Sequence, residues 1–190
     1  MATYRTYKPR LRIDFNYSCG YCKANEPEIG GAKNSFQIDH YQPKKEFPEL
    51  INNYENLIYA CRACNQYKGD YWPTPFESLL QKIILNPRVD NLEKHIDLRN
   101  FEWMAKTLRG KWNILKLRLA SEPHITRRKD RAKIQQMIKK LLDKIPTFQK
   151  EILDLETKGD ILNCQKLRQE YEEHLEDINT LKRKIEGPME

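Results

Sequence analysis

The chain has 190 residues, of which 32% are charged, and it carries a net charge of +7, so one or two domains with apolar cores can form. Its mean hydropathy is −0.84 and no apolar stretch reaches the length of about 18 residues that a membrane span needs, which excludes a membrane protein. Because the first residues show no apolar leader pattern, we expect a protein of the cytoplasm.

The first 18 residues are basic and aromatic, and their pattern fits either a strand or a short helix. After a loop over residues 23–34, Phe36, Ile38 and His40 alternate with polar residues, which predicts a strand. Residues 56–60 predict the returning strand of a hairpin. A turn and a short helix that stops before Pro73 are expected over residues 61–70.

Four of the five cysteines form two Cys-x2-Cys pairs, Cys19 with Cys22 and Cys61 with Cys64. This spacing, without signs of secretion, favours metal thiolates over disulfides. Four thiolates suit tetrahedral Zn²⁺ and leave no open coordination position, so we expect the zinc to be structural. Cys164 lies in a helical pattern and is expected to be a small, buried or half-buried apolar residue.

The middle of the chain, residues 74–122, is expected to be a connector followed by a basic helix. Residues 76–85 are helix-like, Asn86-Pro87 marks a turn, and residues 101–119 predict a helix despite Gly110. Between Met104 and Lys150 there are 14 lysines and arginines but only three acidic residues. Such an excess is typical of a surface that binds the nucleic-acid backbone, although a solvated helix face has the same appearance.

Residues 123–190 show two series of apolar residues with helical spacing. The first runs from Ile134 to Leu155 in steps of four and three, which is a coiled-coil-like pattern in which Pro146 kinks or restarts the helix. The second runs from Leu167 to Ile185, after a helix stop and start at residues 158–160. We therefore predict an antiparallel helical hairpin that serves as a packing arm and carries no chemistry of its own.

The segment between the cysteine pairs contains further polar residues in a specific order. Asp39-His40-Tyr41-Gln42-Pro43 is followed by Asn56-Leu57 and then by Cys61-x2-Cys64-Asn65-x2-Lys68. This pattern closely resembles the HNH (ββα-metal) endonuclease family over residues 19–68. The loop after His40 departs from the family, because it is longer and more aromatic than the Gly-rich turn that the family often has.

The resemblance implies a role for each matching residue. His40 would be the general base, Asp39 and Asn65 would hold a catalytic Mg²⁺ or Mn²⁺, and Lys68 would contact a phosphate. Asn56 would pin the loop between the strands, although an asparagine could also be a metal ligand. Imidazole can take a proton from water near neutral pH, and carboxylate and amide oxygens suit a hard cation, so the residue types fit these roles.

The implied fold is α+β, with three parts. Residues 1–73 would form a small, zinc-stapled HNH nuclease domain, residues 74–122 the connector and basic helix, and residues 123–190 the hairpin. The lengthened loop, Lys68-Gly69-Asp70 and Leu85-Asn86-Pro87 also make the chain similar to the HNH subunits of bacterial anti-phage systems, Septu and certain retrons. That similarity implies a role in antiviral defence and an ATPase partner protein that binds the C-terminal helices.

The expected function is metal-dependent hydrolysis of phosphodiester bonds in nucleic acid, with DNA favoured as the substrate. The alternative is a non-catalytic zinc ribbon that binds nucleic acid or protein. Asp39, His40 and Asn65 discriminate between the two, since a ribbon that only binds does not need them.

Overall fold

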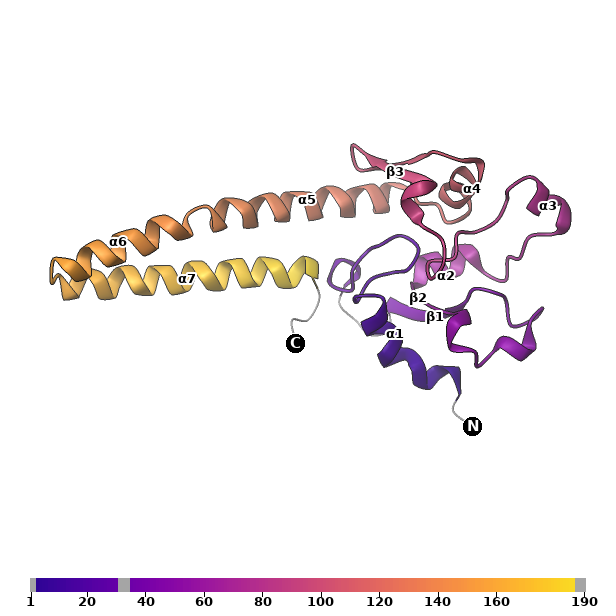
Figure 1. The fold of residues 1–190 in the computed structure, drawn as a ribbon, viewed down its shortest axis with the longest axis horizontal. Coiled ribbons are helices and arrows are strands. Elements are labelled where there is room, and N and C mark those ends of the chain that lie inside the picture. Colours follow the sequence, from indigo (N-terminus) through magenta and orange to yellow (C-terminus); the bar gives the residue numbers. More distant parts are fainter. Residues whose placement is uncertain (1–2, 31–34, 187–190) are drawn as a thin grey trace. The chain divides into compact units, whose positions relative to one another are not determined.

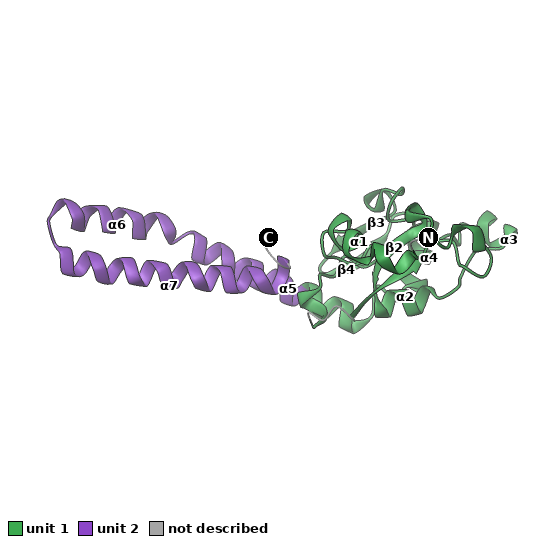
Figure 2. Ribbon diagram, turned by 90° about the horizontal axis from the view of Figure 1, so that it is seen from below, with its two compact units in different colours: residues 1–128 green, residues 129–190 purple. Residues whose placement is uncertain are grey.

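The computed structural model describes residues 3–30 and 35–186 and divides into two compact units, residues 1–128 and 129–190 (Figure 2). The boundary between the units lies inside a helix. That helix begins at Glu122, one residue before the third segment predicted from the sequence, residues 123–190. In chain order (Figure 1) the helices and strands are α1 (Lys8–Asp14), β1 (Phe36–His40), β2 (Leu57–Cys61), α2 (Arg62–Lys68), α3 (Pro75–Leu79), β3 (Ile96–Arg99), β4 (Glu102–Ala105), α4 (Leu108–Lys116), α5 (Glu122–Leu142), α6 (Ile145–Thr157) and α7 (Ile161–Glu186). Two small antiparallel sheets among many helices confirm the α+β class.

The first strand pair and the helix after it form the ββα unit that the sequence predicts. β1 pairs with β2 in antiparallel register, with Phe36 opposite Cys61 and His40 opposite Leu57. All five residues of β2 are buried, and the ring of Phe36 stacks on that of Tyr59 at 4.8 Å between centroids. α2 starts directly after β2, because Cys61 ends the strand and also caps the helix.

The chain before this unit is helical, which settles the choice between strand and helix for the first residues. A 3-10 turn at Tyr4–Tyr7 leads into α1, where Pro9 stands in the first turn, the place in a helix where proline fits. Leu11 of α1 is fully buried in the core of the first unit. A two-stranded sheet is marginal alone, so the surrounding segments are needed to cover it.

The helix predicted over residues 101–119 is wrong in its first part. Residues 96–105 form the β3–β4 hairpin, in which Asn100 and Phe101 have φ of 48° and 68°. Two consecutive positive φ values are what a tight hairpin turn requires, so the local turn prevails over the helical pattern. The helix α4 begins only at Leu108, where the hydroxyl of Thr107 accepts a hydrogen bond from the amide of Gly110.

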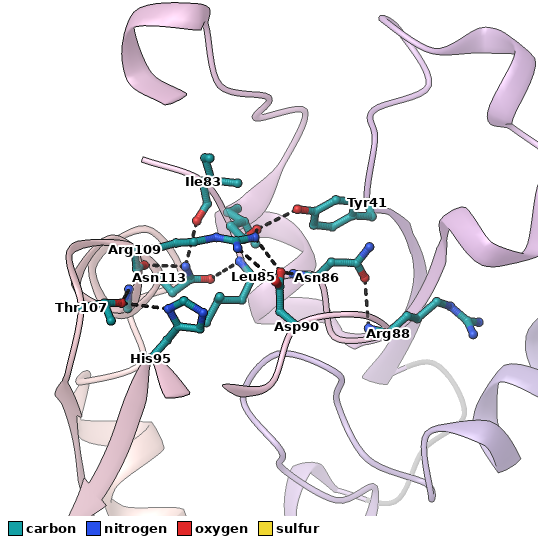
Figure 3. A network of polar contacts seen from close by, with 12 residues as sticks. Tyr41, Ile83, Leu85, Asn86, Arg88, Asp90, His95, Thr107, Arg109 and Asn113 are labelled. Carbon is teal, nitrogen blue, oxygen red and sulfur yellow. Dashed lines mark hydrogen bonds and ion pairs between the residues drawn. The ribbon is translucent and has the colours of Figure 1, made fainter. Parts of the chain in front are cut away.

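The helix-like stretch at residues 76–85 is also shorter than predicted, since α3 ends at Leu79. Ile84 and Leu85 instead lie outside any helix or strand and are buried in the core of the first unit. The side chain of Asn113 on α4 holds this segment: it accepts from the Leu85 amide at 2.8 Å and donates to the Ile83 carbonyl at 3.0 Å (Figure 3). The Asn113 side chain thus provides hydrogen-bond partners for the backbone amide and carbonyl of this segment, which in a helix would bond to other backbone groups.

The second unit confirms the predicted hairpin of helices, with α6 and α7 packed against each other. Pro146 restarts the helix rather than kinking it, because α5 ends at Leu142 and proline stands at the start of α6. The turn at Gly159 has a φ of 71°, and Asp160 accepts a hydrogen bond from the Asn163 amide at the start of α7. The buried residues of this unit include Ile138, Ile178, Ile185 and, as predicted, Cys164.

Candidate active site and metal centre

The two cysteine pairs meet on one side of the ββα unit. Cys19 and Cys22 lie in the loop after α1, Cys61 ends β2, and Cys64 lies in the first turn of α2. All four are buried, and their Sγ atoms lie within 4.8 Å of one another. The cluster therefore joins the N-terminal loop, the sheet and α2 at one point.

The spacing of these sulfurs fits a tetrahedral metal ion. Four thiolates at the usual Zn–S distance of about 2.3 Å stand about 3.8 Å apart. The Sγ atoms of Cys22 and Cys61 are 3.9 Å apart, and the cysteines are not joined by disulfides. The four residues are thus positioned to hold a metal ion, and their sulfur chemistry suits zinc.

Asp39 lies on β1 and is almost completely buried. Its Oδ2 accepts a hydrogen bond from the hydroxyl of Tyr21 at 2.5 Å, and its Oδ1 lies 3.2 Å from Nζ of Lys68. Burial raises the pKa of Asp39 to about 6, although the Lys68 ammonium and the Tyr21 hydroxyl both act to lower it. The ammonium of Lys68 thus lies beside the carboxylate that, by the resemblance, would bind a metal ion.

His40 follows Asp39 at the end of β1, and its ring is held by the loop between the strands. Nε2 lies 2.9 Å from the carbonyl oxygen of Ile51. Since a carbonyl can only accept, Nε2 must carry the proton in the neutral ring, which leaves Nδ1 as the basic nitrogen. Burial lowers the pKa of His40 below its ordinary value, which favours the neutral ring.

Asn65 lies on α2, one turn before Lys68. Its Nδ2 donates a hydrogen bond of 2.7 Å to Oε1 of Gln37, which is two residues before Asp39 on β1. This contact uses the amide nitrogen and leaves the carbonyl oxygen as the atom that could bind a cation. The side chains of Asn65 and Lys68 therefore both contact β1, Asn65 at Gln37 and Lys68 at Asp39.

Asn56 holds the loop that carries the Ile51 carbonyl. Its Oδ1 accepts from the amide of Gln42 at 2.8 Å, and its Nδ2 donates to the carbonyls of Gln42 and Leu50 at 3.0 and 3.4 Å. Its own carbonyl accepts from the amide of Tyr41. These contacts tie Asn56 to the chain on both sides of the loop between the strands.

Lys68 makes contacts that the expected phosphate role does not include. Its ammonium is buried, with a side chain 1% exposed, and besides Asp39 it donates to the carbonyl of His40 at 2.7 Å. A buried lysine needs such partners, because an unpaired charge in the protein interior is costly. In this structure Lys68 thus links α2 to both residues at the end of β1.

Sequence reasoning missed three groups that hold these side chains, namely Tyr21, Gln37 and the Ile51 carbonyl. Tyr21 stands inside the first cysteine pair, between Cys19 and Cys22, and burial together with Asp39 raises its pKa well above the ordinary value. An aromatic residue with a hydroxyl at the centre of a metal-binding turn was the available signal. A backbone carbonyl leaves no signal in the sequence.

Much of the basic segment in the first unit serves structural contacts. Arg109 pairs with Asp90 through both Nη atoms at 3.0 and 2.6 Å, and Figure 3 shows this pair beside Asn113. Lys106 donates to the carbonyl of Glu93, and the guanidinium of Arg128 bonds the carbonyls of Phe101 and Leu119. These cations hold the fold of residues 84–119, so charge count alone overstates the surface open to phosphates.

Comparison with known proteins agrees with this architecture. Residues 19–71 match the family model of the HNH endonucleases. The chain is similar to Septu protein PtuB of Bacillus thuringiensis, with 29% identity over 111 residues, which is 56% of this chain and 40% of that relative. The chain thus spans less than half of the length of the curated relative that it matches.

No solved structure matches the chain. Among the described residues, no helix has the length and apolar character to cross a membrane. The family match covers both cysteine pairs, Asp39, His40 and Asn65. Residues 19–71 therefore form an HNH endonuclease domain, built around four cysteines that are positioned to hold a metal ion.

Proposed function

We propose that this protein is a metal-dependent endonuclease that hydrolyses phosphodiester bonds in nucleic acid, with DNA as the favoured substrate. The observation that carries the proposal is the setting of His40 in the HNH domain. Its Nε2 lies against the Ile51 carbonyl, burial lowers its pKa and so favours the neutral ring, and it adjoins a buried carboxylate on the same strand. A zinc ribbon that only binds a partner has no need for a base held in this way.

In this proposal Nδ1 of His40 takes the proton from the water that attacks the scissile phosphorus. The hydrogen bond from Nε2–H to the Ile51 carbonyl stabilises the imidazolium that forms, because the carbonyl dipole points its negative end at the ring. The Asn56 side chain keeps this carbonyl in place by holding both Gln42 and Leu50. The base is thus oriented by the loop and its tautomer is defined before substrate arrives.

Asp39 and Asn65 would hold one Mg²⁺ or Mn²⁺ ion through a carboxylate and an amide oxygen, the donor types that hard cations prefer. When bound, such an ion supplies positive charge that stabilises the scissile phosphate and the leaving oxygen. The ion pair between Asp39 Oδ1 and the Lys68 ammonium supports this role, because a positive charge already lies beside the carboxylate. Lys68 would turn toward a phosphate once a metal ion takes its place beside Asp39.

The four cysteines would hold a structural Zn²⁺ whose coordination is complete, so it would not bind substrate. Its role would be to fix the spatial relation of β1, which carries His40, to α2, which carries Asn65. The similarity to Septu protein PtuB supports a place in anti-phage defence. We further propose that an ATPase protein is the partner and that the helices α5 to α7 contact it.

The direct test is cleavage of plasmid DNA, and of an RNA of similar length, with Mg²⁺ or Mn²⁺ present. A His40→Gln variant keeps a donor for the Ile51 carbonyl but cannot accept a proton, so we expect the rate to fall by ~10²–10⁴. His174→Gln is the matched control, since that histidine bonds the Leu141 carbonyl in the second unit. Zinc content should be equal in both variants, and cleavage by His40→Gln at the rate of the control would refute the assigned base.

A further inference from the structure

A groove of about 580 Å³ opens beside Asn65, between the N-terminal helical turns and β1. Its polar lining comes from Tyr4, Arg5, Lys8, Gln37 and Asn65. Two of these side chains are cationic and none is acidic, so the groove presents positive charge and amide groups. A site of this composition suits an anion with several oxygen atoms.

Tyr4 connects this groove to the candidate base. Its ring stands edge-on to the ring of His40, with the centroids 4.8 Å apart, and the ammonium of Lys44 lies 5.3 Å from its centre. The amide of Tyr4 donates to Oδ1 of Asn52 at 2.8 Å, which ties the N-terminal turn to the loop between the strands. Tyr4 thus lies between the groove and the buried ring of His40.

Arg5 in this groove differs from the arginines of the basic segment in residues 104–128. There, Arg109 and Arg128 are held by Asp90 and by backbone carbonyls. In the groove, the guanidinium of Arg5 is exposed and lies 5.9 Å from the centre of the Tyr4 ring, and it lowers the pKa of the Tyr4 hydroxyl. A guanidinium carries five N–H donors, so an exposed one beside a single hydroxyl still has donors for a ligand.

We propose that this groove binds the substrate backbone next to the scissile bond, with Arg5 and Lys8 donating to phosphate oxygens and Tyr4 separating that subsite from His40. The inference rests on the proposed nuclease function and adds a substrate-binding role for the segment that precedes the HNH domain. The contacts are to phosphates, so the groove contributes affinity without reading sequence.

The test measures binding in a His40→Gln background, in which bound DNA stays intact. Anisotropy of a fluorescent 20-nucleotide duplex is followed against salt concentration for the parent, for Arg5→Ala/Lys8→Ala and for Lys158→Ala/Lys166→Ala. The last variant removes two exposed positive charges from the second unit and is the matched control. Zinc content and the unfolding midpoint are measured for all three proteins.

We expect the groove variant to bind more weakly and its slope of log K against log salt to shrink by about 1.8, since each lost phosphate contact removes about 0.9. The control should keep the slope of the parent. A groove variant with the parent's affinity and slope would overturn this inference while leaving the nuclease proposal intact. A parent that neither binds nor, with His40 present, cleaves nucleic acid would overturn both.

Discussion

The hydroxyl of Tyr21 donates a hydrogen bond of 2.5 Å to the carboxylate of Asp39. Tyr21 lies between the two cysteines of the first pair, and Asp39 precedes the candidate base on β1. The loop that carries the first two cysteines therefore also orients the carboxylate proposed to hold the catalytic metal ion. A displacement of the cysteine cluster would therefore also displace Asp39, because the Tyr21 side chain connects the two.

Tyr21→Phe should weaken the binding of Mg²⁺ without releasing zinc. A hydrogen bond to a charged group contributes about 1.5–3 kcal/mol, so the Mg²⁺ concentration for half-maximal cleavage should rise about tenfold or more. Activity should recover at high Mg²⁺, which separates a positioning role from simple unfolding. Tyr67→Phe on α2 is the matched control, and an unchanged Mg²⁺ dependence in Tyr21→Phe would contradict this role.

Loss of one cysteine of the cluster should unfold the first unit. Cys61→Ser removes a ligand from four that are within 4.8 Å of one another, and binding energy of a structural zinc is folding energy. Zinc content should fall and the tryptophan fluorescence should report an unfolded environment, since Trp72, Trp103 and Trp112 all lie in the first unit. Cys164→Ser, buried in the second unit, should retain zinc. Retention of zinc and of the tryptophan signal by Cys61→Ser would show that Cys61 is not a ligand on which the metal and the fold depend.

The motif residues and the periodic helices could be predicted from the sequence because their signals are local. The spacing of the cysteines, the alternation around Ile38 and the apolar steps of the second unit each depend on residues close together in the chain. The β3–β4 hairpin could not, since it depends on positive φ at Asn100 and Phe101, neither of them glycine. The contacts of Lys68 were missed for a different reason, because its partner Asp39 is 29 residues away in the chain.

Gly110 should be intolerant of a side chain, although it lies inside α4. A Cβ at this position would stand 2.0 Å from the carbonyl oxygen of His95, so the helix packs directly on the backbone before β3. In an exposed helix, glycine to alanine stabilises by about 1 kcal/mol. Here Gly110→Ala should lower the free energy of unfolding, measured by urea with tryptophan fluorescence. Lys111→Ala at the next position is the control, and a stabilised Gly110→Ala would show that α4 is not seated on His95.

The stability of the first unit should fall between pH 7 and pH 5 because of His124. This histidine is 3% exposed, and burial with the nearby charges of Arg127 and Arg128 lowers its pKa to about 4. Arg127 donates to Nδ1 at 3.2 Å, which requires an unprotonated nitrogen. The unfolded chain takes up a proton near pH 6.5 and the folded chain only near pH 4, so acid favours unfolding in that window.

For a shift of this size the loss at pH 5 relative to pH 7 is about 2 kcal/mol. Urea unfolding followed by tryptophan fluorescence at both pH values gives the difference for the parent and for His124→Gln, which cannot titrate. The cysteine cluster and the carboxylates titrate in both proteins, so subtraction leaves the contribution of His124 alone. Equal pH dependence in the two proteins would mean that the ring of His124 accepts a proton in the folded state as readily as in the unfolded one.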